Sequence, residues 1–334
     1  MKAVVITGPG NLEIVEKPVP KPAAGEILVK IKYCGICGSD LHAFETGFLD
    51  PATTIGHEFS GIIEEIGKDC AGWSAGDPVT GNNIISCGGC SACTSSRDNL
   101  CREVRRLGIT DHGTMAEYAV FPAKDLVKLS KQAPLEQLVL TEPLSVALHA
   151  VNKVNVNPSD RILIIGAGTI GLTLLALLKQ RGIKNVIIFE TNPERQAIAT
   201  KLGASAILNP GQKNPDREIS TLTGNQGVNL VFECAGLPET IQEACSRAEA
   251  GGKAVILSIC YQPVELNFLS LVTQEIDIIS AFGKRGSEFS AAAKLIADGL
   301  IDLSPLITGV IPLEEVAEAF HHPSGSSIKT LIQF

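Results

Sequence analysis

The chain has 334 residues, enough for about two domains, and its 45% hydrophobic, 19% charged and 4% aromatic residues are typical of an ordinary α/β protein. Its formal net charge of -8 argues against binding a nucleic-acid backbone or an anionic membrane through bulk electrostatics, so small-molecule ligands are favoured. The first residues are strand-like and lack the pattern of a signal peptide, and ten cysteines suit a reducing cytoplasm better than a disulfide framework.

Residues 1 to about 150 have the pattern of short strands separated by glycine and proline. This spacing predicts a compact β-rich domain. After an N-terminal strand, the expected strands are Glu26–Tyr33, Ser60–Ile66, Thr114–Phe121 and Asp125–Leu129.

Two short motifs in this domain carry potential metal ligands. They are Cys37-Gly38-Ser39-Asp40-Leu41-His42 and Gly56-His57-Glu58. A thiolate, an imidazole and a carboxylate within about twenty residues suit Zn²⁺ with a vacant position for water or substrate. The sequence therefore predicts a catalytic metal site here.

A second cluster lies further along, with four cysteines in fifteen residues: Cys87, Cys90, Cys93 and Cys101. Four thiolates close a tetrahedron around Zn²⁺ and leave no open position, so this spacing predicts a structural zinc site. An iron–sulfur cluster is the main alternative. Its common run is C-x2-C-x2-C-x3-C-P, whereas here the last gap is longer and Arg102 follows.

From about Asp160 the pattern changes to alternating strands and helices. That alternation predicts a parallel sheet in a doubly wound α/β domain. The apolar run Ile162–Leu178 approaches the length of a membrane span, but glycines split it into a strand, a tight turn and a helix. The expected elements are Arg161–Ile165, Thr169–Arg181, Asn185–Glu190, Pro193–Leu202, Val228–Cys234, Pro238–Ala248 and Lys253–Ile259.

The turn after the first of these strands is Gly166-Ala167-Gly168-Thr169-Ile170-Gly171, a dinucleotide-binding fingerprint in its expected strand–helix context. Glu190 follows nineteen residues after Gly171 and ends the next strand, where a carboxylate can accept hydrogen bonds from the adenosine ribose. Its charge would repel a 2′-phosphate, which favours NAD over NADP. Arg195 keeps NADP open, because a nearby arginine can accommodate that phosphate.

The C-terminal part begins with a last apolar strand, Ile276–Phe282. Two amphipathic helices (about Glu288–Asp298 and Leu313–Phe320) and a terminal strand, Ile328–Phe334, complete the chain. Lys284 and Arg285 could bind a substrate phosphate, but a solvated loop is the favoured interpretation.

Cys37 through His42, Gly56-His57-Glu58, the four cysteines, Glu142-Pro143 and the fingerprint occur in the order found in zinc-dependent medium-chain dehydrogenases, and nearly the whole chain resembles that family. The polyol branch (sorbitol, galactitol-phosphate, butanediol and threonine dehydrogenases) is the most similar in these motifs. The resemblance implies a GroES-like β-barrel catalytic domain (1–150, with the zinc lobe 87–101), a Rossmann NAD-binding domain (151–283) and a segment, 284–334, that returns to the catalytic domain.

The resemblance also implies roles for single residues. Cys37 and His57 are expected zinc ligands. Glu142 matches the position of a second cysteine ligand in alcohol dehydrogenases, and Glu58 is a ligand in some polyol members. Zn²⁺ with one thiolate and one carboxylate is neutral, and a second carboxylate would make it a weaker Lewis acid. We therefore expect the two glutamates to alternate as the third ligand, one bound to the metal while the other lies beside the site.

The same motif implies a proton relay, in which Ser39 takes the substrate hydroxyl proton and passes it through the cofactor ribose to His42 near solvent. The alternative is that Ser39 and His42 only cap a turn. Ile170, Ser258, Ile259 and Phe282 are expected at the cofactor. Phe44 lies where several polyol enzymes carry a hydroxylated or indole aromatic, which weakens the expectation of a sorbitol-like contact.

The expected enzyme therefore holds one catalytic and one structural Zn²⁺, uses NAD to oxidise a secondary alcohol or polyol to a ketone, and forms a homo-oligomer, either a dimer or a tetramer. Alternatives are a phosphorylated-polyol or threonine-type dehydrogenase, a zinc-binding NAD sensor without turnover, and a metal-free relative of the quinone reductases. The last lacks both ligand sets.

Overall fold

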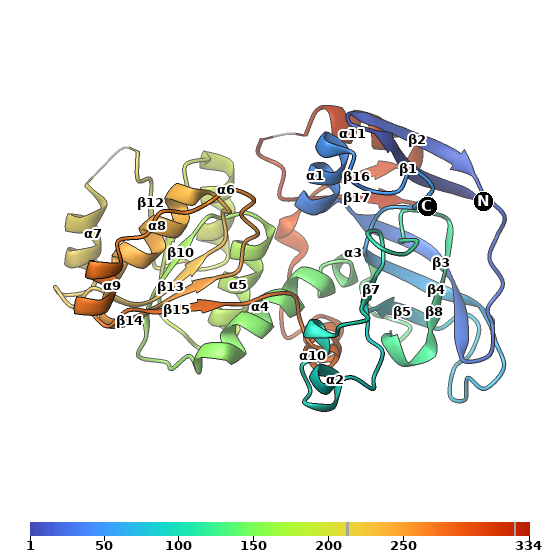
Figure 1. Cartoon of the computed structure of the whole chain (residues 1–334), viewed down its shortest axis with the longest axis horizontal. Coiled ribbons are helices and arrows are strands. Elements are labelled where there is room, and N and C mark those ends of the chain that lie inside the picture. Colours follow the sequence, from blue (N-terminus) through green and yellow to red (C-terminus); the bar gives the residue numbers. More distant parts are fainter. Residues whose placement is uncertain (212–213, 324) are drawn as a thin grey trace. The chain divides into compact units, whose positions relative to one another are not determined.

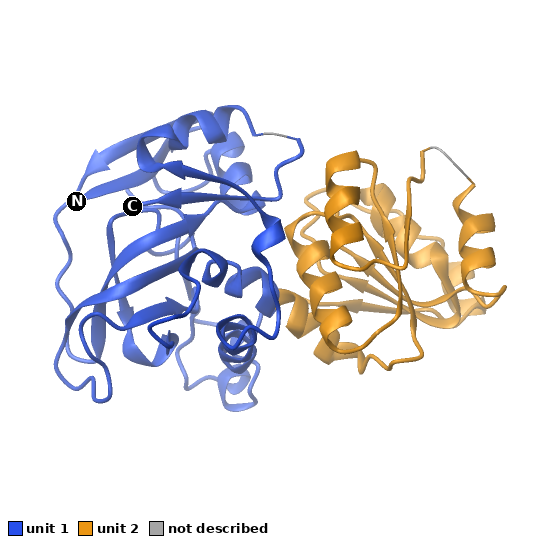
Figure 2. Ribbon diagram, turned by 180° about the vertical axis from the view of Figure 1, so that it is seen from behind, with its two compact units in different colours: residues 1–145, 284–334 blue, residues 146–283 orange. Residues whose placement is uncertain are grey.

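A computed structural model describes residues 1–211, 214–323 and 325–334. The chain divides into two compact units, drawn in different colours in Figure 2. Unit 1 contains residues 1–145 and 284–334, and unit 2 contains residues 146–283. The two ends of the chain therefore belong to the same unit, with unit 2 inserted between them.

The main sheet of unit 1 is mostly antiparallel and has the strand order β16-β17-β3-β4-β5-β9, with β8 also paired to β3 (Figure 1). Among the described residues these pairings form an open path rather than a closed ring. The strands are β3 (Glu26–Gly35), β4 (Glu58–Ile66), β5 (Pro78–Gly81), β8 (Tyr118–Pro122), β9 (Leu126–Lys128), β16 (Ile307–Pro312) and β17 (Lys329–Gln333).

Strand β3 pairs with strands from both segments of the chain that make up unit 1. Its first half pairs with β8, and its end pairs with the C-terminal strand β17, with Leu331 opposite Gly35 and Ile332 opposite Cys34. A core of buried side chains lies against this sheet, including Phe59 and Phe121, whose rings stack with centroids 4.5 Å apart. Full burial of each such side chain contributes roughly 1.5–3 kcal/mol, so this core also holds β17 in the unit.

The predicted strand Thr114–Phe121 was wrong in its first half, because β8 begins at Tyr118. The N–H groups of Thr114 and Met115 donate to the carbonyls of Gly56 and Ile55 instead of continuing the sheet ladder. This loop pairing packs residues 114–115 against the chain that leads into His57.

Shorter elements complete unit 1. The two-stranded sheets are β1 (Lys2–Gly8) with β2 (Asn11–Glu16), and β6 (Ile84–Ile85) with β7 (Arg105–Arg106). The helices are α1 (Gly38–Thr46), α2 (Ser91–Thr94), η1 (Asp98–Leu100), η2 (Ala123–Asp125), α3 (Leu135–Leu138), α10 (Gly286–Ala297), η3 (Ser304–Leu306), η4 (Leu313–Glu315) and α11 (Val316–His321), while α4 (Thr141–Val154) crosses into unit 2.

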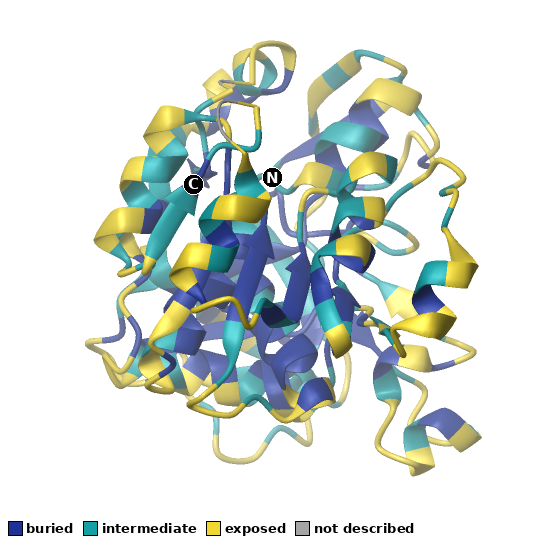
Figure 3. Ribbon diagram, turned by 90° about the vertical axis from the view of Figure 1, so that its left-hand side faces the viewer, coloured by how far each residue is buried: buried dark blue, intermediate teal, exposed yellow. Residues whose placement is uncertain are grey.

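Unit 2 is a parallel six-stranded sheet flanked by helices, which confirms the predicted Rossmann class. The strand order is β12-β11-β10-β13-β14-β15, and in Figure 3 the central strands are buried while the helices expose their outer faces. The strands are β10 (Arg161–Ile165), β11 (Asn185–Phe189), β12 (Ala206–Leu208), β13 (Val228–Glu233), β14 (Ala248–Ile256) and β15 (Asp277–Ser280); the helices are α5 (Thr169–Gln180), α6 (Pro193–Lys201), α7 (Pro215–Leu222), α8 (Pro238–Arg247) and α9 (Phe268–Thr273).

Sequence periodicity misjudged β14 at both ends. The strand begins at Ala248, where a register shift against β13 accommodates the Gly251-Gly252 pair, and it ends at Ile256, before the predicted Ile259. The elements β12, α7 and α9 were not predicted. The apolar run at 162–178 forms β10, a turn and α5 as expected, and across the described residues no helix combines the length and apolar character needed to cross a membrane.

Candidate metal centre and nucleotide site

Three side chains from neighbouring segments of unit 1 converge in the interior. Cys37 precedes α1, His57 precedes β4, and Glu58 is the first residue of β4. Their sulfur, nitrogen and oxygen atoms all lie within 4.8 Å of one another, and His57 and Glu58 are buried. Such a set of donors can hold a metal ion and leave a fourth position open.

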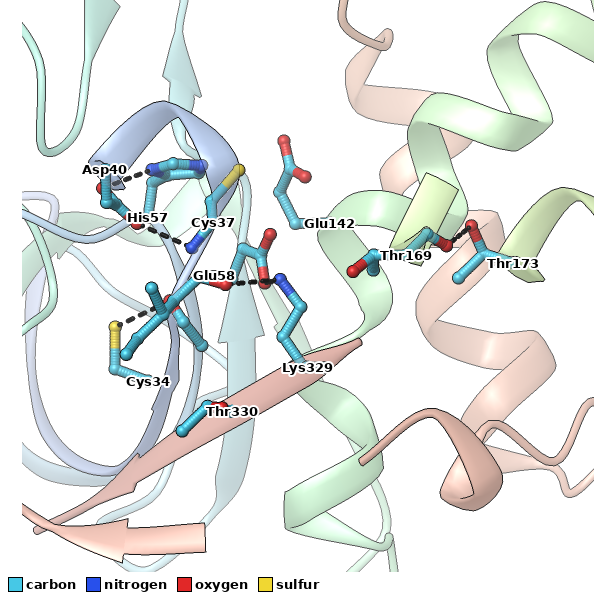
Figure 4. A network of polar contacts seen from close by, with 12 residues as sticks. Cys34, Cys37, Asp40, His57, Glu58, Glu142, Thr169, Thr173, Lys329 and Thr330 are labelled. Carbon is cyan, nitrogen blue, oxygen red and sulfur yellow. Dashed lines mark hydrogen bonds and ion pairs between the residues drawn. The ribbon is translucent and has the colours of Figure 1, made fainter. Parts of the chain in front are cut away.

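Asp40 braces this group. Its Oδ2 accepts a hydrogen bond from the Cys37 backbone N–H at 2.9 Å, and its Oδ1 lies 3.6 Å from His57 Nδ1 (Figure 4). Burial lowers the pKa of His57, but the negative charges of Asp40 and Cys37 outweigh it and hold that pKa well above the usual value. At 3.6 Å this contact is an ion pair rather than a hydrogen bond, so Asp40 acts on His57 through its charge.

Glu58 forms a buried ion pair with Lys329 at the start of β17. The Lys329 Nζ donates to Glu58 Oε2 at 2.6 Å and to the Ile36 carbonyl at 2.8 Å, and both charged side chains are 2% exposed. The pair passes over Gly35, where an added Cβ would lie 2.5 Å from Glu58 Oε2. Burial lowers the pKa of Lys329, but the adjacent Glu58 carboxylate raises it above the usual value overall.

Glu142, in the first turn of α4, has a lysine of its own. Lys284 Nζ donates to Glu142 Oε1 and to Asn83 Oδ1. The favoured interpretation of Lys284 as part of a solvated loop was therefore wrong, since it is 1% exposed. Although burial raises it, the Lys284 ammonium brings the pKa of Glu142 below the usual value. Glu142 lies outside the group formed by Cys37, His57 and Glu58.

The donor types of this interior cluster match a divalent cation. Cys37, His57 and Glu58 offer a sulfur, a nitrogen and a carboxylate oxygen, while Lys329 pairs with Glu58 and Lys284 with Glu142. Sulfur, imidazole and carboxylate donors together fit Zn²⁺.

The residues of the expected proton relay lie on α1, next to Cys37. Ser39 and His42 are half-buried, and the His42 ring lies 6.0 Å from that of Phe48. Phe44, by contrast, is buried in the core and packs edge-on against Phe320 and His321 of α11. A ring held there in the core is not presented as a substrate contact.

The four cysteines form the second group of potential metal ligands. Pairs of their sulfur atoms lie 3.5 Å (Cys90 and Cys93) and 3.9 Å (Cys87 and Cys93; Cys90 and Cys101) apart. Four sulfurs at 2.3 Å from a tetrahedral zinc would be separated by about 3.8 Å, so the geometry fits. Backbone N–H groups of Arg102 and Cys93 lower the pKa of Cys90 to about 6, which favours a thiolate. The β6–β7 pair closes the base of this lobe.

In unit 2 the glycine-rich turn runs from the end of β10 into α5, with Gly168 as the residue before the helix. A Cβ on Gly171 would overlap the Gly166 carbonyl oxygen, so the turn requires glycine there. Glu190 follows β11 and accepts from the Ala167 N–H at 2.9 Å and from the N–H groups of Thr191 and Asn192. The carboxylate therefore lies against the glycine-rich turn, as a ribose-binding acid must.

The other expected cofactor residues lie in several segments of unit 2. Ile170 and Arg195 are half-buried in the first turns of α5 and α6, whereas Ile259 and Phe282 are exposed in loops after β14 and β15. Ser258 donates to Glu233, a fully buried carboxylate that also accepts from the N–H groups of Ala235 and Gly236. Glu233 thus joins the loops that follow β13 and β14.

Sequence reasoning missed Asp40, Asn83, Lys329 and Glu233 and misjudged Lys284. Asp40 had a usable signal, because it occupies the third position of a helix that begins after Cys37, where a carboxylate caps the backbone. Lys329 had none, since it is 271 residues from Glu58 in the chain.

Two family models match this arrangement. Residues 23–131 match the alcohol dehydrogenase GroES-like domain, and residues 169–298 match the zinc-binding dehydrogenase domain. The sorbitol dehydrogenase of Halalkalibacterium halodurans is 31% identical and covers 99% of both chains.

Solved structures agree with these matches over the whole chain. A zinc-binding dehydrogenase of Sinorhizobium meliloti bound to NADP has a TM-score of 0.94 at 31% identity, covering 100% of this chain and 99% of that one. An alcohol dehydrogenase of Escherichia coli CFT073 in complex with NADH has a TM-score of 0.93 at 30% identity, with the same coverage.

A GroES-like unit with a metal-ligand cluster, joined to a Rossmann unit, defines the class of zinc-dependent oxidoreductases that act on CH–OH groups with a nicotinamide cofactor. The chain belongs to the zinc-dependent medium-chain dehydrogenase family, on the side of the alcohol and polyol dehydrogenases.

Proposed function

We propose that this enzyme oxidises a secondary alcohol or polyol to a ketone and transfers the hydride to NAD. The observation that carries the proposal is the cluster of Cys37, His57 and Glu58, whose ligand atoms all lie within 4.8 Å of one another. A purely structural cluster has no need of a ligand set with an open fourth position.

In the proposed mechanism Cys37, His57 and Glu58 would hold the catalytic Zn²⁺, and the bound metal would supply Lewis acidity that lowers the pKa of the substrate hydroxyl. Asp40 would act on His57 through the charge of its carboxylate, which lies 3.6 Å from Nδ1. Ser39 accepts the substrate hydroxyl proton and His42 carries it towards solvent. A bound nicotinamide would supply the hydride acceptor, so the net reaction would convert the alcohol and NAD⁺ into a ketone, NADH and one proton.

The choice of NAD over NADP rests on Glu190. Its carboxylate is already directed at the glycine-rich turn by three backbone N–H groups, which makes it a fixed negative charge at the adenosine ribose. The 2′-phosphate of NADP would be repelled by that negative charge. Arg195, three residues into α6, is the group that could offset it, and a comparison of kcat/KM for the two cofactors decides between them.

Among substrates, non-phosphorylated alcohols are favoured. Lys284 is committed to Glu142 and Asn83 in the interior, so it does not supply a phosphate contact. A panel of substrates would distinguish among non-phosphorylated polyols, vicinal diols and threonine.

The experiment follows NADH formation with secondary alcohols, polyols, polyol phosphates and threonine, before and after removal of metal by a chelator. Metal-dependent NADH formation with at least one alcohol supports the proposal. NAD binding without turnover on any of them would instead support a sensor, and turnover that survives complete chelation would support a metal-free reductase.

We also propose that the chain forms a homo-oligomer through unit 2. β15 ends the sheet order, Ile278 on it is 42% exposed, and α9 before it exposes Phe268, Leu269 and Val272 at 69%, 75% and 71%. An apolar surface next to a strand edge is suited to pairing with a second copy. Val272→Glu should convert the oligomer to a smaller species in sedimentation analysis, and an unchanged mass would reject this surface.

A further inference from the structure

Two lysines lie in the interior beside the metal-ligand cluster. Lys284 is 1% exposed and Lys329 2% exposed. A buried ammonium is costly unless it is paired and hydrogen-bonded, and each of these lysines takes one of the two glutamates that could serve as the third metal ligand. The two pairs are therefore directly comparable.

The two pairs differ in whether the glutamate remains available as a metal ligand. Lys329 contacts Oε2 of Glu58, and the Glu58 carboxylate still belongs to the group with Cys37 and His57. Glu142 is excluded from that group, although it is near enough for its charge to act on Glu58 and for that of His57 to act on it. In Figure 4 its side chain lies on the far side of Cys37 from Asp40.

The restraint on Glu142 comes from an anchored lysine. Lys284 Nζ donates to Asn83 Oδ1 as well as to Glu142 Oε1, and it lies 6.0 Å from the centre of the Phe289 ring. Asn83 precedes β6, and Phe289 belongs to α10. The ammonium is thus held from two directions independent of α4, so Glu142 is pulled towards a fixed point.

We propose that Lys284 is a positioning residue that keeps Glu142 out of the catalytic metal's ligand set and so preserves the open position for substrate. The proposal rests on the proposed function of Cys37, His57 and Glu58 as the ligands of that metal. Of the two glutamates that were expected to alternate as the third ligand, the Lys284 contact would favour Glu58.

Removal of the lysine should reverse this bias. In Lys284→Met the Glu142 carboxylate loses the ammonium that it contacts, and a metal held by Cys37, His57 and Glu58 would be free to attract it. A fourth protein ligand would close the tetrahedron and convert a catalytic site into one of the structural type. The metal would be held more tightly while exogenous ligands would be excluded.

The experiment replaces the catalytic zinc with Co²⁺, whose visible absorption reports the ligand set, and titrates the protein with imidazole as a probe of the open position. In the wild type imidazole should change the spectrum. In Lys284→Met it should not, and release of Co²⁺ to a chelator should slow by about tenfold or more, as expected for an added ligand.

Three variants serve as controls. In Lys284→Met/Glu142→Gln the amide is a poor ligand, so the imidazole response should return. Lys329→Met removes the matched lysine but leaves Glu142 held by Lys284, so the response should persist. Glu142→Gln alone keeps Lys284 in place, and its Co²⁺ spectrum and metal retention should resemble those of the wild type.

An undiminished imidazole response in Lys284→Met would overturn the proposal, as would failure of the double variant to restore it. Should Lys284→Met fail to fold, Glu142→Gln decides, because metal loss in that variant would mean that Glu142 is already a ligand. Failure of the wild type itself to bind Co²⁺ at Cys37 and His57 would contradict the proposed function instead, so the two failures are distinguishable.

Discussion

Replacement of Lys329 by methionine tests whether the interior charges are matched to a metal. The side chain keeps its length and apolar contacts but loses the ammonium, which donates to Glu58 at 2.6 Å and to the Ile36 carbonyl at 2.8 Å. Both members of the ion pair are 2% exposed, so water cannot replace the lost partner.

The expected cost follows from that burial. Breaking a buried ion pair by removing one partner costs about 3–5 kcal/mol, because the remaining charge stays desolvated or must be neutralised. In metal-free protein the free energy of unfolding should fall by roughly this amount. With Zn²⁺ bound, the cation itself compensates Glu58, and the loss should shrink to about 1.5–3 kcal/mol, the value of a hydrogen bond to a charged group.

The assay is urea unfolding of wild type and variant with and without Zn²⁺. Lys329→Met/Glu58→Gln should recover most of the metal-free stability, because no unpaired charge remains. Lys253→Met is the control for an exposed pair, since Lys253 and Asp277 are 40% and 65% exposed, and it should cost less than about 1 kcal/mol. An equal loss for Lys329→Met with and without metal would refute the charge-matching argument.

Three further predictions concern other parts of the molecule. Glu190→Gln removes the fixed charge at the ribose site and should raise kcat/KM for NADP relative to NAD by about tenfold, whereas an unchanged ratio would assign cofactor choice to other residues. Gly35→Ala introduces a Cβ 2.5 Å from Glu58 Oε2, so it should disturb the Glu58–Lys329 pair and weaken Zn²⁺ retention in a chelator assay; wild-type retention would show that the pair can shift freely. Lys128 donates to Asp77 and lowers its pKa, so Asp77 contributes stability above its unfolded pKa of about 3.9 and loses it as the pH falls through the folded value. Asp77→Asn should therefore cost about 1 kcal/mol in thermal unfolding at pH 7 and progressively less below about pH 4, and a constant difference across that range would contradict the assignment.

The sequence by itself determined the chemistry that is encoded locally. The spacing of Cys87, Cys90, Cys93 and Cys101 predicted a sulfur cluster, and the structure brings those sulfurs to tetrahedral separations. The glycine-rich turn and Glu190 predicted a nucleotide site because a strand, a turn and a helix follow one another directly. Such motifs are readable because their residues are neighbours in the chain.

Only the tertiary structure decided how the interior charges are paired. The sequence left Glu58 and Glu142 as equal candidates and assigned Lys284 to a solvated loop. Glu142 and Lys284 are 142 residues apart, and Glu58 and Lys329 are 271 residues apart, so no local pattern connects them. They meet because β17 returns to pair with β3, and because the chain re-enters unit 1 at Lys284. Which glutamate joins the group with Cys37 and His57 is therefore a property of chain topology, since the countercharge of each comes from the C-terminal part of the sequence.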